Sequence, residues 1–124
     1  MRNYLRDPSE FQYVYRQGKR YDGRFITVFV INNEGLHHRL GVTASKKAIG
    51  KAVQRNRAKR LIREAFRVNN SSLKALSGKY DWVLNAKSTL LRVKLDAPAE
   101  EFAGIVDRVS KSELTADATG QSVE

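Results

Sequence analysis

Apolar residues near the start of the chain recur at helical spacing. Segment 9–17 predicts a helix, because its apolar residues keep the i, i+3, i+4 spacing of one helix face: Phe11, Val14 and Tyr15. Ser9 and Gln12 have the spacing of a capping box that would start this helix, and Gly18 is a typical residue to end it. The chain is therefore expected to open with a short amphipathic helix.

Three stretches rich in β-branched and aromatic residues predict strands, at 24–31, 39–45 and 80–86. Turn-forming residues 32–35 separate the first two strands, which predicts that they pair as an antiparallel hairpin. Segment 21–23 is compatible with either a further short strand or a loop.

Helical periodicity returns in the second half of the chain. A helix is predicted over 51–67 and a shorter one over 71–76. Pro98 opens a last helix whose apolar residues keep helical spacing: Phe102, Ile105, Val106 and Val109. Residues 115–124 are small and polar, which predicts a flexible C-terminal tail behind one domain of residues 1–114.

The composition points to one domain with a polyanionic partner. A chain of 124 residues with 41% hydrophobic content has room for a single modest core. Its 23 Lys and Arg against 13 Asp and Glu give a net charge of +10, which suits nucleic acid, an anionic membrane surface or an acidic protein. No apolar run is long enough to span a membrane, and the N-terminus lacks a secretory signal. The absence of cysteine excludes disulfides and thiolate zinc sites and fits a cytoplasmic protein.

The positive charge is concentrated in one segment. Residues 39–67 hold ten basic residues and one acid, Glu64, so nearly the whole excess lies in under a quarter of the chain. On a helical wheel, one side of the helix in this segment is apolar: Ala58, Leu61, Ile62, Ala65 and Phe66. The opposite side carries a polar and basic row, with Arg57 and Lys59 at its margins: Asn56, Arg60, Arg63 and Arg67.

This basic face has two interpretations. Many charged helix faces are only solvated, but opposite charges at i, i+4 normally support such a helix, and here a single acid does so. A row of guanidiniums instead fits phosphates, because each planar guanidinium can bind two phosphate oxygens. The preceding loop, ASKKAIGK, has phosphate-binding character but lacks the Walker spacing, so it is interpreted as an extension of the same surface.

The sequence predicts no catalytic residue and no metal ligand in the protein itself. His37 and His38 are neighbours in a turn-like segment without nearby acids, as is typical of surface histidines. No carboxylate pair or His-x-x-Glu spacing favours a metal site.

These residues together resemble the bacterial ribonuclease P protein subunit. The signature of that family is a strand, a lysine-rich loop and the so-called RNR helix, which stand here as RLGVTASKKAIGKAVQRNRAKRLIREAFR over 39–67. The resemblance extends to SEFQYVYRQGKRYDGRFITVFVI before it and YDWVLNAK after it, and covers about residues 5–110. It implies a single small α/β (α+β) domain that is ribosomal-protein-S5-domain-2-like. The expected features are a mixed sheet of about four strands, helices packed on it and a left-handed β-α-β crossover.

The resemblance also implies a mechanism. In this family a catalytic RNA with bound Mg²⁺ cleaves the phosphodiester bond, while the protein binds that RNA and holds the 5′ leader of precursor tRNA. The residues implied to bind the catalytic RNA are Ser45, Lys46, Lys47, Lys51, Arg55, Asn56, Arg57, Lys59, Arg60, Arg63 and Arg67. Those implied to bind the leader are Phe11, Tyr15 and Phe29, whose flat rings can stack on unpaired bases. Considered without the resemblance, these three aromatic residues are more typical of a core. Asn85 departs from the family, which usually has an apolar residue there.

Other interpretations of the basic helix remain open at this stage. A DNA-binding regulator could place its Arg and Asn side chains in the major groove, although a strand and a loop, not a second helix, precede the basic helix. A ribosomal protein would share the size and the charge. A stand-alone protein nuclease fits least well, because the sequence shows no converging metal-binding acids.

Overall fold

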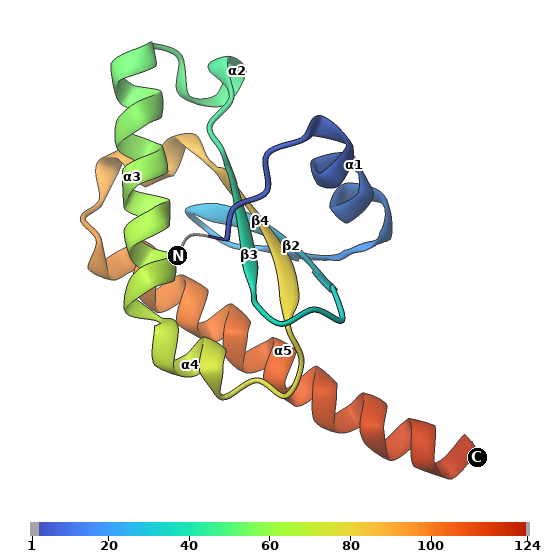
Figure 1. The fold of residues 1–124 in the computed structure, drawn as a ribbon. Coiled ribbons are helices and arrows are strands. Elements are labelled where there is room, and N and C mark those ends of the chain that lie inside the picture. Colours follow the sequence, from blue (N-terminus) through green and yellow to red (C-terminus); the bar gives the residue numbers. More distant parts are fainter. Residues whose placement is uncertain (1–2, 124) are drawn as a thin grey trace.

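The computed structural model describes the backbone of residues 3–123 and the side chains of residues 3–115. Its centre is a mixed four-stranded sheet with helices on both faces (Figure 1). The strands lie in the order β1-β2-β4-β3 and have these bounds: β1 (Lys19–Asp22), β2 (Ile26–Asn32), β3 (Arg39–Thr43) and β4 (Tyr80–Ala86). The predicted α/β domain with a sheet of about four strands is confirmed.

The predicted hairpin between segments 24–31 and 39–45 is wrong. β4 lies between these strands, antiparallel to β2 and parallel to β3. The hairpin partner of β2 is β1, which includes part of the segment left open between strand and loop. β4 is buried over Asp81–Leu84, and a strand so deeply buried must pair its backbone groups along both edges. That requirement prevails over the short turn that separates β2 from β3.

The connection from β3 to β4 carries three helices, because parallel strands need a crossover. They are α2 (Lys46–Ile49), α3 (Ala52–Val68) and α4 (Asn70–Lys74). α3 is within one residue of the predicted helix at each end, whereas α2 is a single turn inside the predicted loop. The hand of the crossover stays a prediction that the resemblance implies.

The main core lies between the sheet and the helices α3 and α5 (Asp96–Val123) (Figure 1). Trp82 of β4 is fully buried at its centre, with its ring centroid 5.4 Å from that of Phe102 and 6.4 Å from that of Phe66. From α3, Ala58, Ile62 and Ala65 are buried, and Leu61 and Phe66 are packed against the same cluster. The predicted apolar side of α3 is therefore confirmed. A 3₁₀ helix, η1 (Ser88–Arg92), joins β4 to the segment that leads into α5.

α1 (Pro8–Gln17) covers part of the other sheet face, but its predicted start is wrong. The N-cap is Asp7, not Ser9, and Glu10 Oε1 accepts the backbone N–H groups of Arg6 and Asp7 at 3.0 and 3.1 Å. Pro8 occupies the first helical position, where its fixed φ and missing N–H favour a helix start two residues earlier than a Ser9 cap would allow.

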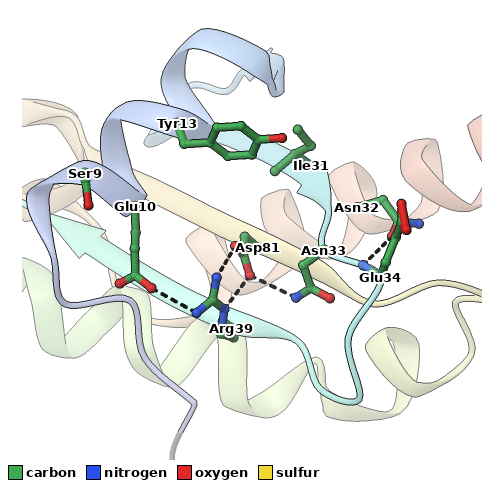
Figure 2. Close-up of a pocket in the computed structure, with 9 residues that line it drawn as sticks. All are labelled: Ser9, Glu10, Tyr13, Ile31, Asn32, Asn33, Glu34, Arg39 and Asp81. Carbon is green, nitrogen blue, oxygen red and sulfur yellow. Dashed lines mark hydrogen bonds and ion pairs between the residues drawn. The ribbon is translucent and has the colours of Figure 1, made fainter.

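An ion-pair network holds α1 to the sheet (Figure 2). Arg39 of β3 donates from Nη2 and Nε to Asp81 of β4 at 2.6 and 2.8 Å, and from Nη1 to Glu10 of α1 at 3.0 Å. Asn33 Nδ2 adds a bond of 2.9 Å to Asp81, whose side chain is only 6% exposed. The hydrogen bond to Asp81 raises the pKa of Arg39, so Arg39 is a structural cation although it belongs to the basic segment.

The last helix extends past the predicted domain boundary. The α5 backbone stays helical to Val123, whereas residues 115–124 were expected to form a flexible tail. The side chains from residue 116 onward lie outside the described residues, so both the boundary at residue 114 and the flexibility of the tail stay predictions.

The interpretation of His38 as a surface histidine is wrong, whereas His37 is exposed as expected. His38 is half-buried and stacks on Tyr80, with ring centroids 6.0 Å apart. Its Nδ1 accepts from the Tyr80 backbone N–H at 3.0 Å and from Trp82 Nε1–H at 3.2 Å, while Nε2–H donates to Leu73 O at 3.0 Å. These partners require a neutral ring with its proton on Nε2.

This histidine should make stability depend on pH. Burial is the largest cause that lowers the pKa of His38, Lys79 lowers it further, and Glu113 opposes the shift. The unfolded chain therefore binds more protons than the folded chain near pH 6, so the stabilisation is fully present above the unfolded pKa of about 6.5 and is lost as pH falls below it. We expect His38→Asn to be less stable by about 1–3 kcal/mol at pH 7.5. The difference in Tm between the two proteins should shrink on acidification to pH 5, and a constant difference would contradict this account.

Candidate nucleic-acid interface

The outer face of α3 is exposed and basic, as predicted. Arg60 and Arg63 point away from the core side of the helix, with Asn56 one turn nearer its start. Within residues 3–115, Arg67 is the one α3 cation that forms an ion pair, with Glu64. Arg57, Lys59, Arg60 and Arg63 therefore keep charges that no acidic side chain of the described part compensates.

The loop before α3 is shaped by two of the residues predicted to bind RNA. Ser45 caps α2, its Oγ accepting the Ala48 N–H at 3.0 Å, and the half-buried Arg55 donates from Nη1 to the Gly50 carbonyl oxygen. Gly50 has a φ of 93°, a backbone conformation that residues other than glycine rarely adopt. Ser45 and Arg55 thus fix the loop, while the three loop lysines stay exposed beside α3: Lys46, Lys47 and Lys51.

A second surface, here called the aromatic face, consists of Tyr15, Phe29, Thr43 and Asn85. Tyr15 of α1 meets Phe29 of β2 edge to face, with ring centroids 4.8 Å apart, and the Arg20 guanidinium lies 5.4 Å from the Phe29 centroid. Tyr15 is 36% exposed and Phe29 is half-buried. Two of the three predicted leader-binding residues are therefore brought together with open ring surface.

Phe11, the third predicted leader-binding residue, has a packing role as well. It is half-buried and rests on Gly41 of β3, where an added Cβ would lie 2.6 Å from its ring. It also packs with the buried residues Leu5, Val14 and Val83. The absence of a side chain at Gly41 thus lets α1 lie directly on the sheet.

The sequence alone did not predict that the polar residues Thr43 and Asn85 belong to the aromatic face. Asn85 Oδ1 accepts from the Tyr15 hydroxyl at 3.0 Å and from Thr43 Oγ1 at 2.6 Å. The register pairs Asn85 with Thr43 and with Thr27, so all three lie on the α1 side of the sheet. The period of two along each strand could have revealed this face only once the strand pairing was known.

The two surfaces meet at the end of β3. Thr43 belongs to the aromatic face, and Ser45, two residues later, begins the basic loop that leads to α3. The aromatic face therefore lies next to the start of the basic loop; stacking surface together with cations is the combination used for single-stranded nucleic acid.

A pocket between α1, β3 and the end of β2 does not suit a polyanion. It has a volume of about 450 Å³ and is lined by Glu10, Glu34 and Asp81 against one cation, Arg39, which both Glu10 and Asp81 already bind (Figure 2). No three His, Cys, Asp or Glu side chains in the described part are placed to hold a metal ion. None of the described helices is long and apolar enough to cross a bilayer.

The chain is similar to known proteins over most of its length. A sequence model of the family described as "Ribonuclease P" matches residues 1–110. The chain belongs to the ribonuclease P protein family. A ribonuclease P protein component from Clostridium botulinum (strain Loch Maree) is 42% identical over 87 residues, which cover 70% of this chain and 76% of that protein.

Solved structures of family members have the same fold. The ribonuclease P protein of Thermotoga maritima superposes with a TM-score of 0.73 at 28% identity, covering 86% of this chain and 97% of that chain. The Staphylococcus aureus protein gives a TM-score of 0.72 at 27% identity, with 88% and 96% covered. The chain is therefore the protein component of the ribonucleoprotein endoribonuclease that acts in tRNA processing, with RNA as its partner.

Proposed function

We propose that the chain binds the catalytic RNA of ribonuclease P through its loop lysines and α3, and holds the 5′ leader of precursor tRNA on the aromatic face. The observation that carries the proposal is the adjacency of the two surfaces at the end of β3. A strand of RNA that lies on Tyr15 and Phe29 leads directly to the cations of the loop and of α3.

In this proposal the protein positions RNA and does not itself react. The chemistry would come from magnesium ions bound mainly by the RNA, which would activate the nucleophile and stabilise the charge of the cleaved phosphodiester. The loop lysines, with Arg57, Arg60 and Arg63, neutralise phosphates of the catalytic RNA, and the aromatic rings stack on unpaired leader bases. The proposal includes a cytoplasmic location, which the absence of cysteine supports.

The asparagine network suggests how the aromatic face is kept ready for stacking. The bond from the Tyr15 hydroxyl to Asn85 ties the end of an exposed side chain to β4, so its ring is held before the leader arrives. Such preorganisation lowers the entropy lost on binding. Asn85, where the family usually has an apolar residue, thus supports leader binding by fixing Tyr15.

Reconstituted cleavage tests the proposal. The chain would be mixed with a bacterial ribonuclease P RNA and labelled precursor tRNA at low magnesium, and leader release followed. Tyr15→Ala should raise KM about 5- to 150-fold, since a stacked base contributes about 1–3 kcal/mol. Tyr13→Ala is the matched control, because Tyr13 is 51% exposed on the same helix but outside the aromatic face.

Shortening the leader separates the two surfaces. With a precursor whose leader is a single nucleotide, Tyr15→Ala and the unmodified chain should perform alike. If Tyr15→Ala and the unmodified chain have equal KM values for the long-leader substrate, leader binding on this face is refuted. Cleavage by the RNA alone that matches the mixture would refute the proposal as a whole.

A further inference from the structure

A second pocket, of about 350 Å³, lies beside the basic face of α3. One side is formed by α3 residues one turn apart, and Leu95, from the segment between η1 and α5, forms the other: Arg57, Arg60, Leu61, Glu64 and Leu95 line it. Leu61 and Leu95 are half-buried, which gives the pocket an apolar surface, while Arg57 and Arg60 are exposed. An apolar recess flanked by uncompensated cations suits a flat base attached to phosphates.

Glu64 at the edge of this pocket is otherwise unexplained. It is the one acid of the basic segment 39–67, and a carboxylate on a phosphate-binding surface repels phosphates. Arg67 donates twice to its Oε1, from Nε at 2.9 Å and from Nη2, whereas no described residue donates to Oε2. The hydrogen bond from Arg67 also lowers the pKa of Glu64, so the group is an ionised, acceptor-only side chain at neutral pH. An i, i+3 pair with Arg67 supports a helix only weakly, and it does not require a place at a pocket.

We propose that this pocket binds one unpaired nucleotide of the catalytic RNA whose base carries an exocyclic amino group, with Glu64 Oε2 accepting from that amino group. The inference rests on the proposed function and adds base selectivity to it. Leu61 and Leu95 pack on the base, and Arg57 and Arg60 bind the flanking phosphates. Uracil is disfavoured, because the two carbonyl oxygens beside its N3–H would face the carboxylate.

Chemical probing of the assembled RNA tests this inference. Dimethyl sulfate reports on unpaired adenine and cytosine, and kethoxal on unpaired guanine, each at the Watson–Crick edge. The unmodified chain should protect one such nucleotide in the catalytic RNA, and Leu95→Asp should restore its reactivity and weaken binding of the RNA about tenfold. Leu36→Asp is the control, since Leu36 is 85% exposed in the loop between β2 and β3 and lies outside the pocket.

A second variant makes the test independent of packing at Leu95. Changing the protected nucleotide to uracil should weaken binding by the unmodified chain about tenfold. It should have little effect on Glu64→Gln, because a neutral amide can donate to a uracil carbonyl. Glu64 is on the solvent side of α3, so this variant should keep the fold.

Three results would overturn the inference. In the first, the chain binds the catalytic RNA but protects no nucleotide that depends on Leu95, and then the proposed function stands without this pocket. In the second, the protected nucleotide lies in precursor tRNA. In the third, the chain does not bind the catalytic RNA, and then both proposals fail together.

Discussion

Replacing Arg39 by methionine is expected to lower the free energy of unfolding by about 3 kcal/mol, near the lower end of the range for a broken buried pair. The variant leaves Asp81, with its side chain 6% exposed, without a cation, while Glu10 loses the bond that ties α1 to β3. Arg39 itself is 38% exposed, so solvent compensates part of the loss. Domains of this kind are stable by about 5–15 kcal/mol in total. Urea unfolding at pH 7 measures the difference.

A matched pair of controls distinguishes this cause from a general loss of charge. Arg20→Met breaks the Arg20–Asp22 pair, whose side chains are more than half exposed, and should lower stability far less than Arg39→Met does. Adding Asp81→Leu to Arg39→Met removes the orphaned carboxylate and should recover much of the stability. Equal losses for Arg39→Met and Arg20→Met would show that the network contributes nothing specific.

The elements of the fold were predictable where the pattern is local. The sequence gives α3 to within one residue because a two-faced periodicity runs through the whole helix. It also locates the segments of β2, β3 and β4. The pairing of the strands was not predictable in this way, because β4 enters between β2 and β3 from some 40 residues further along the chain. A turn signal at 32–35 reports only that the chain reverses there, not which strand becomes its neighbour.

The basic residues likewise divide into those whose surroundings follow from local pattern and those whose surroundings depend on tertiary contacts. The row on α3 was identified correctly, since helical geometry alone determines which residues share a face. Arg39 was counted in the same basic segment, although its partners Asp81 and Glu10 are distant in sequence and compensate its charge. The roles of His38 and Asn85 were not predicted for the same reason, because each role depends on hydrogen bonds to other elements. Local pattern therefore identified the exposed cations of α3, and tertiary pairing decides which basic residues of the segment remain free.

That distinction leads to the largest expected effect on RNA binding. Replacing both Arg60 and Arg63 by alanine should weaken binding of the catalytic RNA on the order of 100-fold at about 0.1 M salt. Each lost phosphate contact should also lower the slope of log affinity against log salt by about 0.9, so the slope should fall by about 2. Binding titrations from about 50 to 200 mM salt measure both quantities. Lys74→Ala with Lys111→Ala removes the same charge from α4 and α5 and should leave the slope almost unchanged.

A comparison of two arginines within α3 tests whether the salt dependence of RNA binding follows the unpaired charge or the total charge. Arg63 and Arg67 lie one turn apart on the same exposed face, but Arg67 is already paired with Glu64. Arg63→Ala should therefore reduce the salt slope by about one, and Arg67→Ala by clearly less, because part of its charge is compensated before RNA binds. Equal reductions would mean that RNA displaces Glu64 from Arg67 on binding. A smaller effect at Arg63 than at Arg67 would place the RNA nearer the C-terminal end of α3 than the adjacency of the loop and the aromatic face requires.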